Sequence, residues 1–382
     1  MRIAMICDVL GEANNGTVIA ALNLIRYLKE KGHTVYVVSP EDSTRGLENY
    51  YVTPTMDLGF LLNRIVERNG VQLAKADPAV LEEAIEKADV VHLEVPFVLS
   101  ECALRIAREK GKPVTASFHC QAENVTAHLG PMMNDRLANH LVYQAFYRTI
   151  YRHCDVIHYP TEFIRRVFYE NTPINRPYRV ISNGVNDAFF APFERKEPPT
   201  GGPFTVISTG RYSKEKDQST LIRAVGRSRY RERIRLVLAG DGPMKARLQR
   251  LAAREGVNVE FRFFSREELI GALHAADLYV HAAVVEIEAI GCIEAIAAGL
   301  PALIADSEKS ATRFFSVDEK TLFRPRDPED LMHKIEFFMD HPGELSRMRE
   351  KYKEISRGFD QKSCMEKMED MLRDAAELRF RS

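Results

Sequence analysis

The sequence predicts an α/β protein built from two doubly wound parallel sheets. Short runs rich in Val, Ile and Leu alternate with amphipathic helical stretches along the chain. This alternation is typical of parallel sheets that are covered by helices on both faces. It pauses once, near residues 183–203, and then restarts, so we expect two Rossmann-like domains. A chain of 382 residues is long enough for two cores of roughly 150–200 residues each.

The first domain is placed at residues 1–190. Its expected strands are short, buried and rich in β-branched residues: 2–7, 34–39, 90–93, 114–118, 156–158 and 179–181. An amphipathic helix is expected over residues 17–31. The predicted linker is the polar segment 192–203, which carries prolines and a Gly-Gly pair.

The second domain is placed at residues 203–360. Its expected strands are 204–208, 235–239, 259–261, 278–281 and 302–304. Charged helical segments follow at 330–339, 345–356 and 362–378. We expect the last part of the chain, residues 361–382, to form a helix that packs back on the first domain.

Composition excludes several classes of protein. The net charge of −1 gives no electrostatic case for nucleic-acid binding. No run approaches 18 apolar residues, so we expect no transmembrane helix. The six cysteines contain no CxxC pair, which argues against a zinc site and a disulfide framework. Because the chain opens on a strand-like run and not on a signal peptide, we expect a protein of the reducing cytosol.

The stretch 284–301 carries two carboxylates, Glu286 and Glu294, with seven residues between them. An Ala-rich helix is expected around and after Gly291, with Glu294 in its first turn and Gly299 and Pro301 ending it. A helix N-terminus that follows a loop of small residues suits an anion, because free N–H groups and the helix dipole point there. Two nearby carboxylates suit sugar hydroxyls. The hypothesis is therefore a nucleotide-sugar site.

Loops after two expected strands of the first domain are further candidates. The loop 8–17 includes Gly11 and Gly16, which allow a ligand to approach closely, but it lacks the GxGxxG pattern of dinucleotide sites. A plain strand-to-helix turn is the alternative. His119 follows the strand 114–118, where polar groups gather at the carboxyl end, and a hydrogen-bonded structural histidine is the alternative.

The second domain has two more candidate loops. Arg211 and Lys216 follow Gly210 on a loop that leads into a helix, and two cations there suit a diphosphate. The alternative is a solvated charged loop, because Lys214 also lies there. The glycine pair in 240–243 allows a ligand to approach, but a turn with proline at the first helical position is the alternative.

In order and spacing, these motifs resemble those of the family 4 glycosyltransferases over essentially the whole chain. These enzymes retain configuration and have the GT-B fold, in which two Rossmann-like domains face each other across a cleft. The matching motifs are Gly210-Arg211 with Lys216, Gly240-Asp241-Gly242-Pro243, Glu286 and Glu294-Ala295, Gly299-Leu300-Pro301, and the interdomain segment Asn183-Gly184-Val185-Asn186. Residues 286–294 and 306–312 are most similar to the branch that glucosylates diacylglycerol and related lipids.

The resemblance implies a hexosyltransferase with an N-terminal acceptor domain and a C-terminal nucleotide-sugar domain. Arg211 and Lys216 would neutralise the leaving diphosphate, Glu294 would hold the ribose and Glu286 the transferring sugar. His119 would lie by the reacting sugar and Gly16 by the diphosphate. Two further groups are implied in donor binding: Arg262 and Phe263 beside the base, and backbone N–H groups of Ala289, Ile290 and Gly291 at the phosphates.

The expected substrates are a UDP-sugar and a lipid acceptor such as diacylglycerol. We expect no tightly bound cofactor and no strict need for a metal, because the chain has no DxD motif. One departure stands out, since the family often has Gly-Phe-Gly after the first glutamate. This chain has Ile287-Glu288-Ala289 there, and Glu288 has no assigned role.

A cytosolic enzyme that acts on a bilayer lipid must dock on the inner face of the membrane. The segment 135–171 interleaves arginines with aromatic residues, which suits a membrane interface. The alternative is two ordinary helices whose aromatic residues face the sheet. The loop 49–60 is a second candidate, and it could act as a mobile acceptor lid.

Three other functions stay open. One is the same chemistry on a soluble or polysaccharide acceptor. Another is a nucleotide-sugar epimerase on the same scaffold, which would turn over the donor without an acceptor. A nucleotide-sugar sensor without catalytic activity is a third reading.

Overall fold

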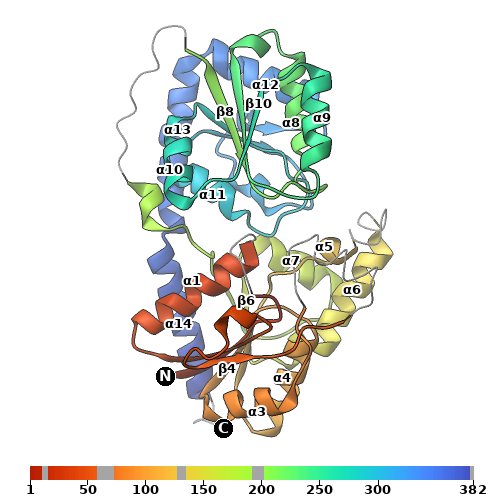
Figure 1. Cartoon of the computed structure of the whole chain (residues 1–382), viewed down its shortest axis with the longest axis vertical. Coiled ribbons are helices and arrows are strands. Elements are labelled where there is room, and N and C mark those ends of the chain that lie inside the picture. Colours follow the sequence, from red (N-terminus) through yellow and green to blue (C-terminus); the bar gives the residue numbers. More distant parts are fainter. Residues whose placement is uncertain (11–15, 58–72, 127–134, 192–201, 379–382) are drawn as a thin grey trace. The chain divides into compact units, whose positions relative to one another are not determined.

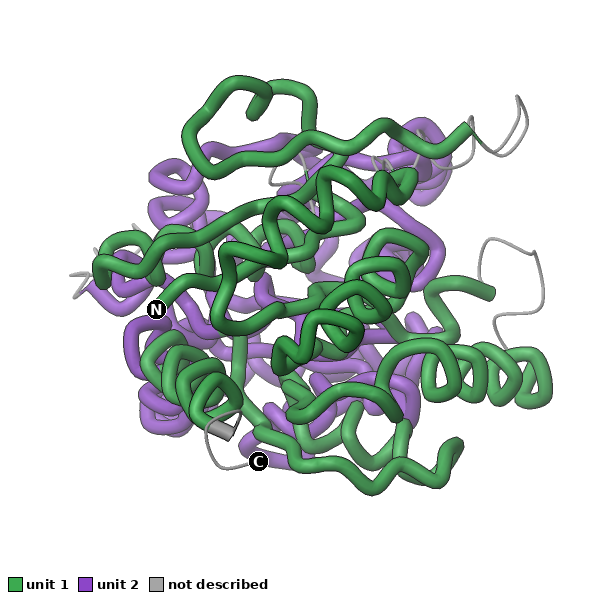
Figure 2. The backbone as a smooth tube through the Cα atoms, turned by 90° about the horizontal axis from the view of Figure 1, so that it is seen from below, with its two compact units in different colours: residues 1–183, 364–382 green, residues 184–363 purple. Residues whose placement is uncertain are grey.

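The computed structural model describes residues 1–10, 16–57, 73–126, 135–191 and 202–378. The chain divides into two compact units (Figure 2). Unit 1 comprises Met1–Asn183 and Cys364–Ser382, and unit 2 comprises Gly184–Ser363. Much of the predicted linker lies outside the described residues.

Unit 1 contains a parallel sheet with the strand order β3-β2-β1-β4-β5-β6-β7. Its strands are β1 (Arg2–Ile6), β2 (Thr34–Ser39), β3 (Tyr50–Val52), β4 (Val90–Leu93), β5 (Val114–Ser117), β6 (Val156–Tyr159) and β7 (Tyr178–Val180). Six of them were predicted within one residue at each end. Every residue of β4, β5 and β6 is buried, as expected for strands covered on both faces.

Unit 2 contains a second parallel sheet, in the order β10-β9-β8-β11-β12-β13. Its strands are β8 (Phe204–Thr209), β9 (Ile234–Ala239), β10 (Val259–Arg262), β11 (Leu278–His281), β12 (Ala302–Ala305) and β13 (Leu322–Phe323). In each sheet the order reverses once, between β1 and β4 and between β8 and β11. The predicted pair of doubly wound α/β domains is therefore confirmed.

The helices described in unit 1 connect its strands, apart from the C-terminal helix, which no strand follows. They are α1 (Gly16–Glu30), α3 (Pro78–Lys87), α4 (Val98–Glu109), α5 (Ala122–Thr126), α6 (Arg136–Thr149), α7 (Glu162–Asn171) and α14 (Gln361–Leu378). A shared apolar core joins α1 and α14 to β1 and β2, and Leu24, Met368 and Leu372 are among its buried members.

The helices of unit 2 lie on both sides of its sheet (Figure 1). α8 (Gln218–Arg227) packs against α9 (Lys245–Glu255) and α12 (Pro328–Asp340) on one side. On the other side are α10 (Arg266–Ala275), α11 (Ile290–Ala297) and α13 (Pro342–Ser356). None of the helices in the described parts of the chain is both long and apolar enough to cross a membrane.

Most aromatic residues of the segment 135–171 face the core and do not form a membrane surface. Tyr143, Tyr151 and Phe168 are buried and surround Phe118, with ring centroids 4.7 to 6.4 Å from it. The alternative of two ordinary helices therefore holds for these rings. Burying an aromatic ring in the core stabilises the folded state, whereas leaving it exposed to water does not.

The loop 49–60 also differs from its prediction. Tyr50–Val52 forms β3, which pairs with β2 at the edge of the sheet. The Lys29 ammonium lies 4.3 Å from the Tyr50 ring centroid, and Tyr36 contacts the Tyr51 ring edge-on. These residues are therefore part of the sheet and not of a lid, and residues 58–60 lie outside the described residues.

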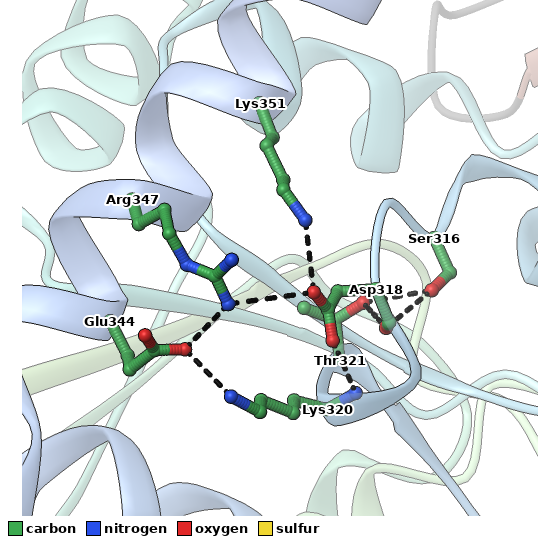
Figure 3. Close-up of polar contacts among 7 residues, drawn as sticks. All are labelled: Ser316, Asp318, Lys320, Thr321, Glu344, Arg347 and Lys351. Atoms are coloured by element: carbon green, nitrogen blue, oxygen red, sulfur yellow. Dashed lines mark hydrogen bonds and ion pairs between the residues drawn. The ribbon is translucent and has the colours of Figure 1, made fainter.

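An ion-pair network attaches the segment before β13 to α13 (Figure 3). Asp318 accepts a hydrogen bond of 2.9 Å from Lys351 and lies 3.7 Å from Arg347. Glu344 bridges Arg347 and Lys320 at 2.7 and 2.8 Å. Asp318 also accepts the backbone N–H of Lys320, so it caps the short helical turn that follows it.

We expect Asp318→Ala to lower the unfolding free energy of unit 2 by about 1–2 kcal/mol, because both the cap and the ion pair are lost. Asp318→Asn keeps the cap and should cost less than about 1 kcal/mol. The hydrogen bond from Lys351 holds the pKa of Asp318 below its usual value. Its stabilisation is therefore present above the pKa of the unfolded chain and is lost as pH falls through the folded value.

Urea unfolding at pH 7 and pH 3 tests this prediction. The difference between wild type and Asp318→Asn should be smaller at the lower pH. The control is Glu232→Gln, which removes an exposed ion pair with Arg231 and should change stability by less than about 0.5 kcal/mol. Equal effects of Asp318→Asn and Glu232→Gln at pH 7 would contradict the role of the network.

Candidate active site

The residues predicted to bind a donor diphosphate and sugar gather at the carboxyl ends of β8 and β11 in unit 2. These two strands are neighbours, and the strand order reverses between them. Loops that leave adjacent strands in opposite directions create a place for a ligand at this switch point. Arg211 and Lys216 follow β8, and Glu286 follows β11.

Two glycine loops hold each other at this edge of the sheet. The Tyr212 backbone N–H donates to the Asp241 carbonyl at 2.8 Å. A Cβ atom on Gly240 would lie 2.1 Å from the Gly210 carbonyl oxygen, and one on Gly242 would lie 2.6 Å from that of Tyr212. Only glycine allows so close an approach. The motif 240–243 therefore supports the loop that carries Arg211 and Lys216.

Lys216 and Glu286 form a largely buried ion pair. The Lys216 ammonium donates to Oε1 of Glu286, and the His281 ring nitrogen Nε2 lies 3.3 Å from the same oxygen. Burial alone raises the pKa of Glu286, but Lys216 and then His281 outweigh it and lower the pKa to about 2. Glu286 therefore stays ionised at physiological pH, as a fixed acceptor of hydrogen bonds and not as an acid.

His281 is a member of this cluster that the sequence analysis missed. Its Nδ1 lies 3.3 Å from the Tyr279 hydroxyl, which in turn lies 3.0 Å from the Thr209 hydroxyl. Its position could have indicated this role, because His281 is the last residue of the expected strand 278–281, and Glu286 follows at the same carboxyl end.

Arg211 is half-buried at the start of the loop after β8. Burial lowers the pKa of its guanidinium, with Glu215 acting in the opposite direction. The Gln218 side chain donates to the Arg211 carbonyl at 2.9 Å and so fixes the backbone there. Lys214 on the same loop is exposed and lines a separate cavity of about 240 Å³, which Arg211 and Lys216 do not line.

α11 begins beside this cluster. Its N-cap is Ala289, which has a left-handed backbone (φ +64°) and makes no side-chain capping bond. Ala289 stands where the family often has glycine, and the strain is roughly 1–2 kcal/mol. At the other end, Gly299 has φ +74° and, with Leu300, donates back to the carbonyls of Ile296 and Ala295, so the predicted glycine stop is confirmed.

Glu294 lies in the second turn of α11 and not in the first, because the helix starts at Ile290. Burial raises the pKa of the Glu294 carboxyl to about 7, and Arg266 opposes this shift. Glu288 is 3% exposed and lies in the loop between Glu286 and the helix. The three carboxylates of this stretch thus all lie in poorly solvated surroundings.

Arg262 and Phe263 lie at the carboxyl end of β10, the edge strand of the sheet. The Arg262 guanidinium pairs with Glu268 and lies 4.7 Å from the Phe264 ring centroid. Phe263 is 65% exposed. An exposed aromatic ring at this position is available to stack on a base.

In unit 1, the loop after β1 carries Asp8 before it leaves the described residues at 11–15. Gly11 lies in that gap, whereas Gly16 is the first residue of α1. The Asp8 carboxylate accepts hydrogen bonds from the Leu99 and Ser100 backbone N–H groups at 2.8 and 3.1 Å. It therefore caps α4, next to the switch point between β1 and β4.

His119 lies beyond the carboxyl end of β5 and is 9% exposed. Its Nε2 is 3.5 Å from Oε2 of Glu94, which follows β4 and is 2% exposed. Burial lowers the pKa of His119, with smaller contributions from His158 and His92. Burial raises the pKa of Glu94 to about 8. The sequence analysis did not single out Glu94, although it directly follows an expected strand.

Comparison with protein families identifies the class of protein. The family model "Glycosyltransferase Family 4" matches residues 14–189, and "Glycosyl transferases group 1" matches residues 190–357. Each model covers one of the two Rossmann-like halves described above. The chain therefore belongs to the family 4 glycosyltransferases, and its activity is glycosyl transfer.

Individual proteins agree with this assignment. An alpha-monoglucosyldiacylglycerol synthase from Streptococcus pneumoniae is 24% identical over 79% of this chain and 70% of its own length. A GDP-mannose-dependent alpha-mannosyltransferase from Mycobacterium tuberculosis is 27% identical over 80% of this chain and 79% of its own. The structure of HepE from Anabaena with UDP is 14% identical over 98% of this chain and 100% of its own, with a TM-score of 0.74. The GT-B fold is thus confirmed.

The structure brings Arg211, Lys216, Glu286 and the start of α11 to one end of the sheet of unit 2. Arg262 and Phe263 lie at the same end, at the edge strand, while Gly16 and His119 belong to unit 1. The roles assigned to these residues stay predictions.

Gly291 supplies a test of the packing under this site. A Cβ atom there would lie 2.3 Å from the Thr209 hydroxyl oxygen. We expect Gly291→Ala to destabilise unit 2 by roughly 1–3 kcal/mol through overpacking. Gly271→Ala in α10 meets no atom within 4 Å and should stabilise it by roughly 0.5–1 kcal/mol.

Thermal unfolding of both variants is the measurement. Removing the hydroxyl with Thr209→Ala should recover much of the loss caused by Gly291→Ala, because the next atom met is 3.4 Å away. If Gly291→Ala and Gly271→Ala were equally stable, the close approach of α11 to β8 would be disproved.

Proposed function

We propose that this protein transfers a hexose from a UDP-hexose to a hydroxyl group of a membrane lipid such as diacylglycerol, with retention of configuration. The observation that carries the proposal is the buried cluster of Lys216, Glu286 and His281, with Arg211 on the same loop as Lys216. It lies where the carboxyl ends of β8 and β11 meet, beside the start of α11.

The chemistry of a nucleotide-sugar suits these groups. Its diphosphate is already a good leaving group, so the enzyme must mainly stabilise the negative charge that develops on it. Arg211, Lys216 and the uncapped N–H groups of α11 are donors that can take this role. In the proposed mechanism they replace a metal clamp, and no tightly bound cofactor is needed.

The ionised state of Glu286 supports a particular division of roles. A carboxylate whose pKa is about 2 cannot serve as an acid near neutral pH, but it accepts hydrogen bonds from sugar hydroxyls. We therefore propose that Glu286 binds the transferring sugar and Glu294 the ribose. The acceptor hydroxyl attacks from the face that the leaving group occupies and gives its proton to the departing phosphate.

A lipid acceptor is supported by the name of the relative from Streptococcus pneumoniae and by one exposed helix face. On α6, Leu137 and Leu141 are 68% and 60% exposed, and Arg148 lies on the same stripe at helical spacing. Apolar and cationic side chains together suit an anionic bilayer surface. We propose that the protein docks there on the cytoplasmic face.

One assay tests the function. The protein is incubated with UDP-glucose, UDP-galactose or GDP-mannose, with and without vesicles that contain anionic lipid and either diacylglycerol or cholesterol. We expect nucleotide release that depends on a UDP-sugar and on diacylglycerol, co-sedimentation with the vesicles, and an α-linked product. Transfer to soluble sugars alone would favour the second acceptor class. Donor turnover without an acceptor would favour an epimerase, and a β-linked product would rule out retention.

In the same assay we expect Arg211→Ala to lower kcat by about 10²- to 10³-fold, because one preorganised donor to the leaving group is lost. The matched control is Lys214→Ala. It removes an exposed cation three residues further along the same loop and should leave kcat within about two-fold. Equal losses in the two variants would show that the loop acts only through its net charge.

A further inference from the structure

Glu94 is a buried carboxyl group of unit 1 that lies between two imidazole rings. Its Oε2 is 3.5 Å from Nε2 of His119, and its Oε1 is 3.7 Å from Nε2 of His92. Among the residues that the structure describes, no Lys or Arg lies within 4.0 Å of this carboxyl, and Oε1 has no hydrogen-bond partner. A carboxylate would therefore lack a cation to stabilise it.

Hydrogen bonds on the far side of His92 fix which of its nitrogens carries the proton. His158 Nε2 lies 2.7 Å from the Ile181 carbonyl, which only accepts, so this nitrogen bears hydrogen. His158 Nδ1 then accepts from the Ser117 hydroxyl at 2.8 Å. Because the Ser117 hydroxyl already donates its hydrogen to His158, its oxygen accepts from His92 Nε2 at 2.9 Å.

This series of hydrogen bonds ends at Thr115, whose hydroxyl donates to Nδ1 of His92 at 2.8 Å. Both ring nitrogens of His92 are thus used, and its Nε2 proton points at Ser117. Glu94 cannot accept that proton unless the hydrogen bond from His92 to Ser117 is broken. Of the two imidazoles beside Glu94, His119 is therefore the one left to pair with it.

His119 is free to make that pair. Its Nε2 faces Glu94, and in the described parts of the chain no hydrogen-bond partner is found for its Nδ1. The His158 ring lies edge-on to it at a centroid distance of 5.6 Å and limits its rotation. The side chain thus has one nitrogen turned to the protein and the other available to a ligand.

We propose that Glu94 is a positioning residue for His119. As a neutral acid it directs its proton to Nε2 of His119, and so keeps the other proton of the pair on Nδ1 as a donor to a hydroxyl of the reacting sugar. The part that involves the sugar rests on the proposed function. At 3.5 Å the pair is longer than a hydrogen bond, and we expect it to shorten to about 2.8 Å when the donor binds.

The surroundings favour neutral forms of both groups. Burial raises the pKa of Glu94 to about 8 and lowers that of His119, so the proton stays on the carboxyl group at pH 7. Cys7 and Tyr151 also face Glu94, and burial raises the pKa of each well above its usual value. Asp8, on the neighbouring β1 loop, is held by backbone N–H groups.

The carboxyl group is also shielded from water. It borders a cavity of about 10 Å³, whose other walls include the apolar side chains of Leu24, Met365 and Met368. A space of this size holds at most one water molecule. The same cavity is lined by His119 and Asn183, so contact of Glu94 with water is limited there to a single molecule.

The test combines histidine NMR with pH-rate profiles on the full-length protein. ¹⁵N-histidine spectra are recorded between pH 6 and 9.5, and the His119 signal is assigned with His119→Gln. We expect His119 to carry its proton on Nδ1 at pH 6.5 and to change tautomer as Glu94 ionises near pH 8. In Glu94→Gln, which still donates, the Nδ1–H form should persist over the whole range.

Activity should follow the same pattern. The kcat of wild type should fall above about pH 8, and this alkaline limb should be missing in Glu94→Gln. Glu94→Leu should lose at least about ten-fold in kcat with little change in the KM for the donor, since positioning acts on the reacting state. Glu123→Gln, the control, alters another buried carboxyl of unit 1, which accepts from Tyr143, and should keep the wild-type pH profile.

The pH dependence of the Tm tests the ionisation of the Glu94 carboxyl in the absence of any substrate. The folded pKa of Glu94 lies above its usual value, so its stabilisation is present at low pH and is lost as pH rises through about 8. The Tm of wild type should therefore fall more steeply between pH 6 and 9 than that of Glu94→Gln.

A His119 ring that carries its proton on Nε2 at pH 6.5, or that keeps one tautomer to pH 9.5 in wild type, would overturn the proposal. So would an unchanged alkaline limb in Glu94→Gln. The expected tautomer shift in a protein that shows no transfer activity would support the pairing and count against the proposed function alone.

Discussion

The ion pair between Lys216 and Glu286 is the interaction on which the site of unit 2 depends. It joins the loop after β8 to the loop after β11, across the point where the strand order reverses. The backbone of Glu286 is held as well, because its carbonyl accepts from the Ala311 N–H at 2.9 Å. With both its side chain and its backbone fixed, Glu286 fixes the loop that leads to α11, whose N-cap residue makes no side-chain capping bond.

Glu286, Glu294 and Glu94 are chemically identical side chains that the fold places in three different states. Burial raises the pKa of each. For Glu286, a cation and an imidazole reverse the effect and lower the pKa to about 2. For Glu294, Arg266 opposes the rise only in part, and the pKa is about 7. The described residues place no Lys or Arg beside Glu94, whose pKa reaches about 8. Local partners, and not depth of burial, therefore decide which carboxyl binds as an anion and which holds a proton.

Much of the fold was accessible from the sequence because parallel strands buried on both faces are continuous apolar runs. The runs at β4 and β11 were placed without error. β3 was missed because its three half-buried residues, two of them tyrosines, form an edge strand with no apolar alternation. The aromatic residues of α6 and α7 were ambiguous for a related reason. A helix that alternates aromatic and basic residues fits both a core and a membrane until its buried face is known.

For the site, the positions of Arg211, Lys216 and Glu286 after expected strands indicated ligand loops, and the order and spacing of the motifs, through the resemblance to the family 4 glycosyltransferases, grouped them with Glu294. The sequence did not determine that Lys216 pairs with Glu286, that His281 lies beside Glu286, or that Glu94 lies beside His119. These groups come from strands that are adjacent in space but tens of residues apart in the chain. Their protonation depends on distances of a few ångströms and on the exclusion of water, which only the tertiary structure decides.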